Sequence, residues 1–100
     1  MIRGTTPTHT FTIPFEVDQI ADLRISYGQS DVEKIKKTKL DCMLFDNKIQ
    51  VTLTQEDTFK LDCSKQVKLQ LRILTIDGEV FNSQIKLLTV GQCLNNEVLK

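Results

Sequence analysis

The 100-residue sequence has no tryptophan, one tyrosine, one histidine, four glycines and two prolines. The single histidine, His9, excludes metal sites built from several imidazoles, and any histidine-dependent catalytic dyad or triad would have to use it. Four dispersed glycines exclude the glycine-rich loops that hold phosphate groups. With Tyr27 as the only tyrosine, few rings remain on which a sugar or a nucleobase could stack.

The sequence also lacks net charge, because 13 basic residues balance 13 acidic ones. A dedicated nucleic-acid binder gains most of its affinity from neutralising phosphates, so this class is disfavoured. An anionic membrane surface would attract such a chain equally little. Because the net charge is zero, copies of the chain repel one another only weakly, which is compatible with a protein that works in an assembly. We therefore expect neither a nucleic-acid partner nor a membrane partner.

Cysteine is scarce, at three residues, and its odd number and wide spacing fit neither a disulfide framework nor a paired-cysteine metal site. We interpret Cys42 and Cys63 as small apolar side chains on strands. A Cys–His nucleophile pair that includes His9 stays open, although no local motif marks a nucleophile. No metal or cofactor is expected. The sequence shows no signal peptide and no run of 18 apolar residues, so we expect a protein made in the cytoplasm.

Two-residue alternation predicts strands in the first third of the sequence. Residues 8–15, "THTFTIPF", alternate threonine with apolar residues, and Pro14 predicts an edge strand or a strand end. We interpret His9 as an exposed histidine among these threonines. Residues 17–30 predict a second strand with Tyr27 on its apolar face, closed by a turn that contains Gly28.

The next segment is denser in apolar residues. Around Lys34 the pattern fits a bulged strand or a short helix, and the narrow apolar face favours the strand. Asp46-Asn47 predicts a tight hairpin turn. Between these features, apolar residues occupy both parities, which predicts a strand covered on both sides; they are Leu40, Cys42 and Leu44 on one parity and Met43 and Phe45 on the other.

The alternation then stops for about ten residues and resumes at Val67. Thr54, followed by Glu56 and Asp57, is typical of a capped helix start, so "TQEDTFKLD" predicts a short helical crossover near residues 54–61. Such a connection is needed where a chain passes from one sheet of a sandwich to the other. This interpretation assigns both carboxylates to the helix end rather than to an acid–base pair.

Residues 67–73, "VKLQLRI", alternate without a break and give the strongest strand signal; Asp77-Gly78 predicts a turn, and residues 80–90 the return strand. About seven short strands predict an all-β fold, an antiparallel β-sandwich of the Ig-like or jelly-roll type. We expect one domain over residues 1–100, with an N-terminal arm at 1–9 and a C-terminal arm at 91–100.

One basic cluster stands out, formed by Lys34, Lys36, Lys37 and Lys39. It fits a solvated face or a charge guard on an edge strand, with Lys34 and Lys36 on one face near Arg24. Contact with an acidic partner is the alternative. Nucleic acid fits least, because no aromatic residues alternate with the lysines.

Three segments together resemble small virion structural proteins of tailed phages and prophages of low-GC Gram-positive bacteria: "MIRGTTPTHTFTIPF", "VTLTQEDTFKLD" and "VKLQLRILTIDGEVFNSQIKLLTV". The Leu-Thr-x-x-Asp-Thr turn and the strands after it are similar to the N-terminal β-sandwich module of phage baseplate upper proteins. This resemblance covers roughly the latter half of the chain, and none of its motifs is catalytic.

The resemblance implies a non-enzymatic protein that is made in the host cytoplasm and docks on other virion proteins in several copies. It would decorate or cement the capsid, or belong to the tail or baseplate. An alternative is a host-surface or carbohydrate-binding module on the virion. We expect the arms and a sheet edge to make main-chain and apolar contacts, as in strand addition. The arm residues expected to take part are Ile2, Arg3, Thr5 and His9 in the leading arm and Leu94, Val98 and Leu99 in the trailing arm.

Overall fold

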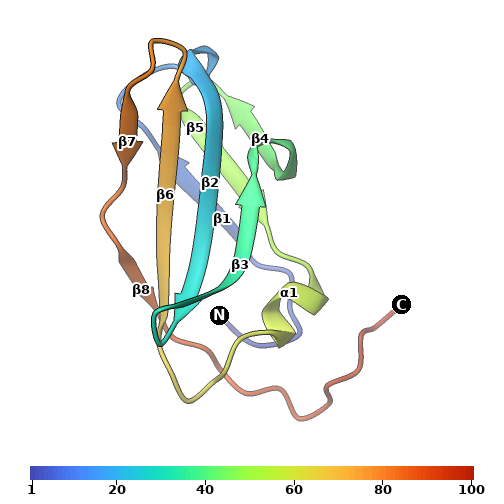
Figure 1. Ribbon diagram of the computed structural model, residues 1–100. Coiled ribbons are helices and arrows are strands. Elements are labelled where there is room, and N and C mark those ends of the chain that lie inside the picture. Colours follow the sequence, from blue (N-terminus) through green and yellow to red (C-terminus); the bar gives the residue numbers. More distant parts are fainter.

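The computed structural model describes all residues from Met1 to Lys100 and shows two antiparallel β-sheets packed face to face (Figure 1). One sheet has the strand order β1-β5-β4, and the other has the order β3-β2-β6-β7, with β8 also paired to β6. The predicted all-β sandwich is confirmed. The strands are β1 (Thr8–Thr12), β2 (Ile20–Gln29), β3 (Val32–Thr38), β4 (Cys42–Phe45), β5 (Lys48–Thr52), β6 (Val67–Thr75), β7 (Val80–Asn82) and β8 (Lys86–Leu88).

The core lies between the two sheets and is filled by the apolar parity of each strand. Val67, Leu69, Leu71 and Ile73 of β6 are all buried, while the residues between them face outward. β2 pairs with β6 over nearly its whole length. The alternation in residues 67–73 therefore predicted both the strand and its buried face.

One end of the hydrophobic layer is closed by a polar side chain, Gln29, that satisfies backbone groups of the loop before β6. The buried Gln29 donates from Nε2 to the carbonyls of Asp62 (2.7 Å) and Lys65 (3.1 Å), and its Oε1 accepts from the Asp62 N–H (2.8 Å). A buried amide with these partners costs little desolvation energy and fixes the loop.

The first hairpin differs from its prediction in the position of the turn. β1 ends before Pro14 and lies at a sheet edge, as expected. β2, however, continues through Gly28, and the turn falls on Ser30 and Asp31, both of which have positive φ. Gly28 lies at a register shift, where an added Cβ would come within 3.2 Å of the Val32 carbonyl oxygen. This glycine is needed for close approach rather than for a turn.

The segment around Lys34 is a bulged strand, as preferred from the sequence. Tyr27 pairs with Ile35 and Gly28 pairs with Glu33, so Lys34 is the extra residue of the bulge. The next predicted strand is present as β4, but the prediction that it is covered on both sides was wrong. In β4 the parity of Met43 and Phe45 is exposed, by 65% and 40%, and Leu40 is 97% exposed in the 3-10 turn η2 (Lys39–Asp41), because no third layer covers this side of the three-stranded sheet.

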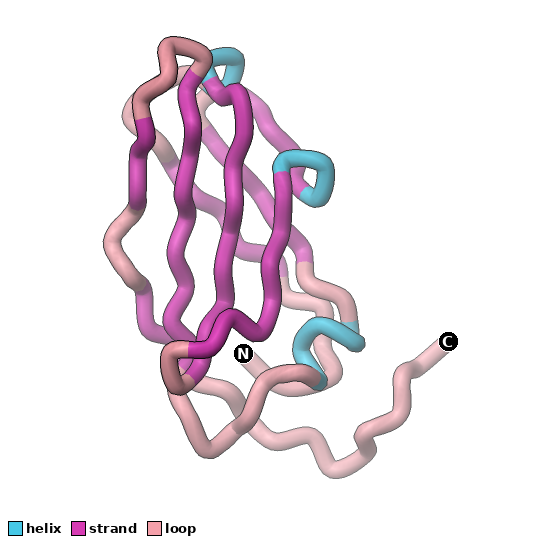
Figure 2. The backbone as a smooth tube through the Cα atoms, in the orientation of Figure 1, coloured by secondary structure: helices cyan, strands magenta, loops and turns pink.

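The predicted helical crossover is confirmed as α1 (Gln55–Phe59), which connects β5 in one sheet to β6 in the other (Figure 2). The Thr54 hydroxyl accepts from the Asp57 N–H, and the Asp57 carboxylate accepts from the Thr54 N–H, each at 3.0 Å. Asp57 also forms an ion pair with Lys37 of β3 at 2.7 Å. The same carboxylate therefore begins the helix and attaches it to the five-stranded sheet.

The return strand is divided into β7 and β8, so the structure has eight strands where about seven were predicted. At the division, Ser83 turns its side chain toward β6, and its Oγ accepts from the Leu71 N–H at 2.9 Å. The Ser83 N–H donates to the Leu71 carbonyl at 2.8 Å. The side chain thus takes the place of a backbone acceptor where the regular ladder is interrupted.

Candidate interaction surface

The outer face of the five-stranded sheet carries charged and apolar side chains in cross-strand rows. In one row Arg24 of β2 lies opposite Arg72 of β6, which lies opposite Asn82 of β7. In the next row Asp22, Leu74 and Val80 are neighbours in the same way. Like charges directly opposite each other destabilise a sheet, so the two arginines need compensation.

That compensation comes from different partners. Arg24 donates from Nη1 to the Asp22 carboxylate at 2.6 Å and to the Leu23 carbonyl at 2.8 Å. This hydrogen bond from Arg24 holds the pKa of Asp22 below its ordinary value. Arg72 donates from Nε to the Asn82 side-chain oxygen at 3.0 Å and has no carboxylate partner. A hollow of about 200 Å³ lies between these two rows; its lining is Asp22, Leu23, Arg24, Arg72, Ile73, Leu74 and Val80.

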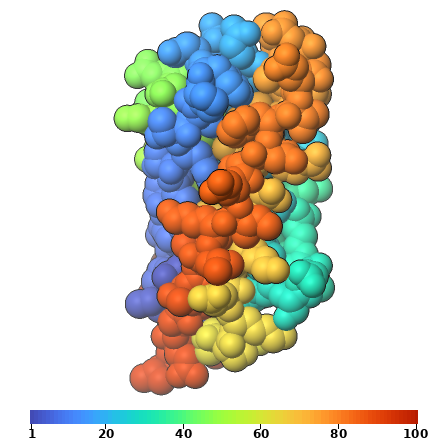
Figure 3. Space-filling view, turned by 90° about the vertical axis from the view of Figure 1, so that its left-hand side faces the viewer, coloured from blue at the N-terminus to red at the C-terminus, as the bar shows by residue number.

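Exposed aliphatic side chains extend from this hollow along β6, β7 and β8 and form what we call the apolar strip. Leu74, Ile76 and Val80 are 41%, 60% and 60% exposed, and Ile85 and Leu87 are 54% and 55% exposed. Figure 3 looks onto the β7–β8 edge of the sandwich, where the orange β7–β8 segment lies beside the blue N-terminal segment. Several exposed aliphatic residues on adjacent strands are typical of a surface that another protein covers.

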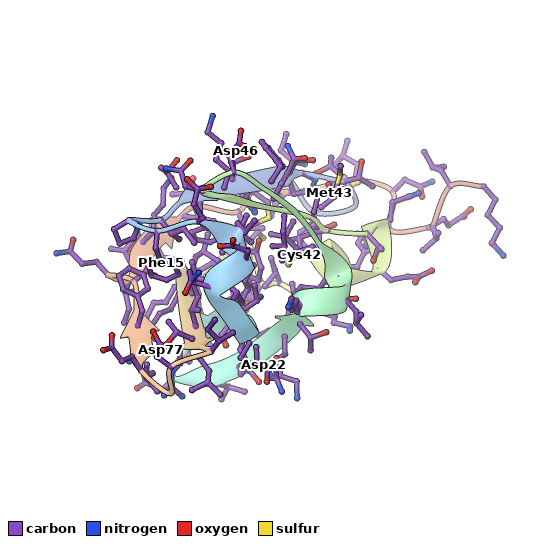
Figure 4. The ribbon with its side chains drawn as sticks, turned by 90° about the horizontal axis from the view of Figure 1, so that it is seen from above. Phe15, Asp22, Cys42, Met43, Asp46 and Asp77 are labelled. Carbon is purple, nitrogen blue, oxygen red and sulfur yellow. The ribbon has the colours of Figure 1, made fainter.

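A second, smaller apolar group lies on the opposite sheet and consists of Leu40, Met43 and Phe45. Viewed from above, Met43 lies on the far side of the sandwich from Asp22 and Asp77, with Cys42 between the two layers (Figure 4). The two apolar groups therefore belong to opposite outer faces.

The lysine cluster does not act as one surface. Lys36 lies opposite Ser26 on the outer face, one row from Arg24, as expected. Lys37 lies opposite Ile25 instead, is largely buried and pairs with Asp57. Lys39 donates to the Ile20 carbonyl at 3.0 Å. Burial raises the pKa of Asp57, but the hydrogen bonds from Lys37 and Thr54 outweigh burial and lower it below its ordinary value.

The leading arm is attached to its own chain. Ile2 forms a parallel bridge with Gly91, and the Gly91 N–H donates to the Met1 carbonyl at 2.7 Å. Arg3 donates to the Phe59 carbonyl at 3.0 Å and lies 5.6 Å from the centre of the Phe59 ring. The Thr5 carbonyl accepts from the Thr58 hydroxyl at 3.0 Å. Of these arm residues, Ile2 keeps an exposed apolar side chain.

Beyond Gly91, the trailing arm is hydrogen-bonded to the rest of the chain at Leu99, whose backbone forms two hydrogen bonds with the Gln55 side chain, at 2.8 and 2.9 Å. The side chains of Leu94 and Leu99 remain exposed, and Val98 is half-buried. The structure does not gather the seven predicted contact residues into one surface, and His9 lies apart from the others in the sandwich interior.

His9 was predicted to be exposed, and this prediction was wrong. It shares the inward parity of Phe11, and its Nδ1 is 2.6 Å from the hydroxyl of the fully buried Tyr27. Burial, with the positive charges of Lys86 and the N-terminus, lowers the pKa of His9 and favours a neutral imidazole. Burial also raises the pKa of Tyr27.

The cysteines are free thiols. Cys42 and Cys63 pack against the core, as small apolar side chains do, but only Cys42 lies on a strand; Cys63 lies in the turn before β6, so its predicted strand position was wrong. The Cys42 thiol donates to the Thr38 carbonyl at 3.3 Å, and burial raises its pKa to about 11, so it is protonated at neutral pH. His9 hydrogen-bonds Tyr27 rather than a cysteine, and the structure does not assemble the Cys–His pair that the sequence left open.

No group of three or more histidine, cysteine, aspartate or glutamate residues is arranged to hold a metal ion. No helix of the chain has the length and apolar character that crossing a membrane would require. Comparison with protein-family models, curated proteins and solved structures gives no match to this chain.

Sequence reasoning missed the apolar strip because its members come from three different strands and the two connections between them. Each member looked like an ordinary strand or turn residue. One signal was available: Leu74 and Ile76 continue the polar parity of Lys68, Gln70 and Arg72 with apolar side chains. A change from charged to apolar on the outward parity of a strand indicates that the end of that strand is covered.

Proposed function

We propose that the protein is a non-enzymatic virion structural protein of a tailed phage, which docks on a larger assembly through protein–protein contacts. It would decorate or cement the head, or belong to the tail or baseplate, and it would be present there in several copies. The observation that carries the docking role is the apolar strip. Exposed aliphatic side chains, here next to Arg72, which has no carboxylate partner, are typical of a protein-binding surface. The three resembling segments support the phage context.

The carbohydrate-binding alternative depended on an exposed ring. Tyr27, the ring considered for it, is fully buried and hydrogen-bonded to His9. No other feature of the outer faces favours a sugar site over a protein contact.

The proposal is tested on particles produced by the genome that encodes the chain. After purification by density gradient, quantitative mass spectrometry should find the chain in a fixed ratio to a major virion protein. A Leu74→Glu, Val80→Glu double variant should be lost from the particles, because it places charges in the apolar strip. The control, Lys48→Glu on the opposite sheet, should be retained. A chain that is absent from purified particles would refute the proposal.

A further inference from the structure

The outward face of β6 is an ordered row of basic, polar and apolar side chains. Its members, which alternate with the buried residues of the strand, are Lys68, Gln70, Arg72 and Leu74. Leu74 lies opposite Val80 of β7, and these two side chains form the exposed aliphatic wall of the hollow of about 200 Å³. This face therefore offers a cation and an aliphatic surface two positions apart on one strand.

Arg72 is a cation of this row that lacks an acid. None of the four ion pairs of the structure includes it. Its Nε donates to the Asn82 side-chain oxygen at 3.0 Å, which orients the guanidinium and leaves its two terminal nitrogens without an acceptor. The neighbouring acid, Asp22, pairs with Arg24 at 2.6 Å instead. An oriented guanidinium with free nitrogens is prepared for a bidentate contact with a carboxylate from elsewhere.

The trailing arm, residues 91–100, carries an acid and an aliphatic side chain at the same spacing. Glu97 is exposed and takes part in no ion pair, and Leu99 is exposed as well. In Figure 1 the arm projects from the sandwich at the end opposite to the β6–β7 turn. Its two hydrogen bonds to the Gln55 side chain are exposed to solvent. A segment held by so few exposed bonds opens at low cost in free energy.

An extended arm matches the outward row of β6 position by position. In an extended chain, residues i and i+2 point to the same side and lie about 7 Å apart, as they do in β6. When the arm runs parallel to β6, its Glu97 carboxylate can lie opposite the Arg72 guanidinium. Leu99 then lies opposite Leu74, on the aliphatic wall of the hollow.

One further position agrees with this alignment. Asn95, two residues before Glu97, falls opposite Gln70. The Gln70 Nε2 donates to the Ser83 carbonyl at 3.1 Å, which leaves the Gln70 side-chain oxygen as an acceptor for the Asn95 amide. Extending the arm breaks a local hydrogen bond from the Glu97 N–H to the Asn95 side chain, at 2.8 Å, and the contact with Gln70 replaces it.

We infer that the trailing arm of one copy binds the outward face of β6 in a second copy, with its Glu97 carboxylate on Arg72 and its Leu99 side chain in the hollow. Each copy has one such face and one arm, so the contact is head-to-tail and closes into a ring or continues as a chain of copies. The inference rests on the proposed docking role and names the partner for the β6 part of the apolar strip. Ile85 and Leu87, farther along the strip, remain free for other proteins.

The charge on the outer face selects the arm rather than the outer face of a second copy. Four cations share this face: Lys36, Arg24, Arg72 and Lys68. Two such faces brought together would oppose like charges, which disfavours the contact. The arm instead brings a carboxylate, because Glu97 is the only charged residue within residues 91–99.

The first test uses two charge reversals, Arg72→Glu and Glu97→Arg, studied alone and mixed. Either variant alone sets like charges against each other at every contact, so each should raise the dissociation constant of self-association at least about tenfold in sedimentation-velocity analysis. In an equimolar mixture, the face of either variant and the arm of the other again carry opposite charges. The mixture should therefore recover association close to that of wild type, in oligomers that contain both variants in equal numbers by native mass spectrometry.

Each reversal has a matched control. Asn96→Arg adds the same side chain one position before Glu97, on the side of an extended arm that faces away from β6. Lys36→Glu reverses a charge on the same outer face, two strands away from β6. Both controls should associate nearly as wild type does.

The second test locates the contact by nuclear magnetic resonance. A synthetic peptide of residues 91–100, added to the isotope-labelled full chain under reducing conditions, should shift the amide signals of Gln70, Arg72 and Leu74. The same shifts should be absent when the labelled chain is Arg72→Glu. Shifts confined to Gln55 and its neighbours would overturn the inference, because the arm would then bind only at its attachment on α1.

A wild-type chain that stays monomeric at millimolar concentration would also overturn the inference. So would association that neither reversal weakens, or that mixing the two variants does not restore. These outcomes are separate from the proposed function, because a chain that is missing from purified particles refutes that function whether or not copies associate in solution.

Discussion

The two edges of the five-stranded sheet, β3 on one side and β7 with β8 on the other, are protected against strand addition in different ways. An edge strand exposes unpaired backbone groups to which another strand could add. At β3 the edge is bulged at Lys34 and carries Lys36, and the buried Lys37–Asp57 pair ties it to α1. At β7 and β8 the edge is divided at Ser83 and carries Val80 and Leu87 instead.

Both edges are therefore interrupted, but only one is charged. Lysines on β3 resist the approach of any strand, whereas the aliphatic side chains on β7 and β8 favour contact through side chains once the regular backbone ladder is broken. The β7–β8 edge therefore combines an interrupted backbone ladder with exposed aliphatic side chains. Such an edge can bind a partner through its side chains, while the interruption disfavours unspecific strand addition.

The largest expected effect comes from removing the attachment of the β3 edge. Asp57→Ala removes the helix cap and leaves Lys37 buried without its counter-ion. We expect a loss of about 3 kcal/mol in the free energy of unfolding, measured by urea denaturation. Glu56→Ala on the same short helix is the control, because this exposed residue has no ion pair, and it should change stability by less than about 0.5 kcal/mol.

The same site predicts a pH dependence. The folded-state pKa of Asp57 lies below its unfolded value, so the carboxylate stabilises the fold above the unfolded pKa, which is about 3.9, and that contribution is lost as the pH falls through the folded-state pKa. The difference in unfolding free energy between wild type and Asp57→Ala should narrow below about pH 4. A difference that stays constant from pH 7 to pH 3 would contradict this account.

A smaller effect is expected at the other edge. Ser83→Ala removes the acceptor for the Leu71 N–H and should cost about 1 to 2 kcal/mol in thermal or urea unfolding. Hydrogen exchange should show the Leu71 amide losing protection more than its neighbours in β6. Ser83→Thr keeps the hydroxyl and serves as the control. An unchanged Leu71 amide in Ser83→Ala would mean that the side chain does not complete the ladder.

Charging the apolar edge should alter association while leaving folding nearly intact. Val80→Lys introduces into β7 a positive charge like that of Lys36 on β3, at a position that is 60% exposed. We expect a change in unfolding free energy below about 0.5 kcal/mol. In the same samples, light scattering across concentration should show weaker self-association than wild type. An unfolding change above 1 kcal/mol would show that Val80 belongs to the core instead.

The reverse change should have the smallest effect on stability. Lys36→Val removes a charge from the β3 edge and should raise the light scattering of concentrated samples, since the guard against strand addition is weaker. Lys48→Val, on the central strand of the other sheet, should not do so, because β5 already has neighbours on both sides. If both variants scattered light equally, the lysine on the β3 edge would not be what protects the protein against strand addition.

Local patterns predicted the sandwich, because alternation and caps are properties of neighbouring residues. The strand at residues 67–73, the stop near Pro14, the bulge at Lys34 and the Thr54 cap all act within a few positions of the sequence. The turn was misplaced because Gly28 serves a close backbone approach instead of a turn.

The interaction surface was beyond such reasoning. Leu74 and Val80 become neighbours on one surface only when β7 pairs back on β6, and β4 keeps its apolar side exposed only because the fold supplies no third layer. His9 could have been assigned correctly, since its parity with Phe11 directs it inward, away from the threonines on either side.

The bridge between Ile2 and Gly91 bears on how the fold is reached during synthesis. A ribosome adds about 5–20 residues per second, so the first residues wait roughly 5 to 18 s before their partner segment has been made. β2 likewise waits for β6, which begins about forty positions after β2 ends. The N-terminal segment is therefore made first but is among the last to reach its final position. In the nascent chain β2 can pair with β3 early, but its other edge stays without a partner until the latter half of the sequence emerges.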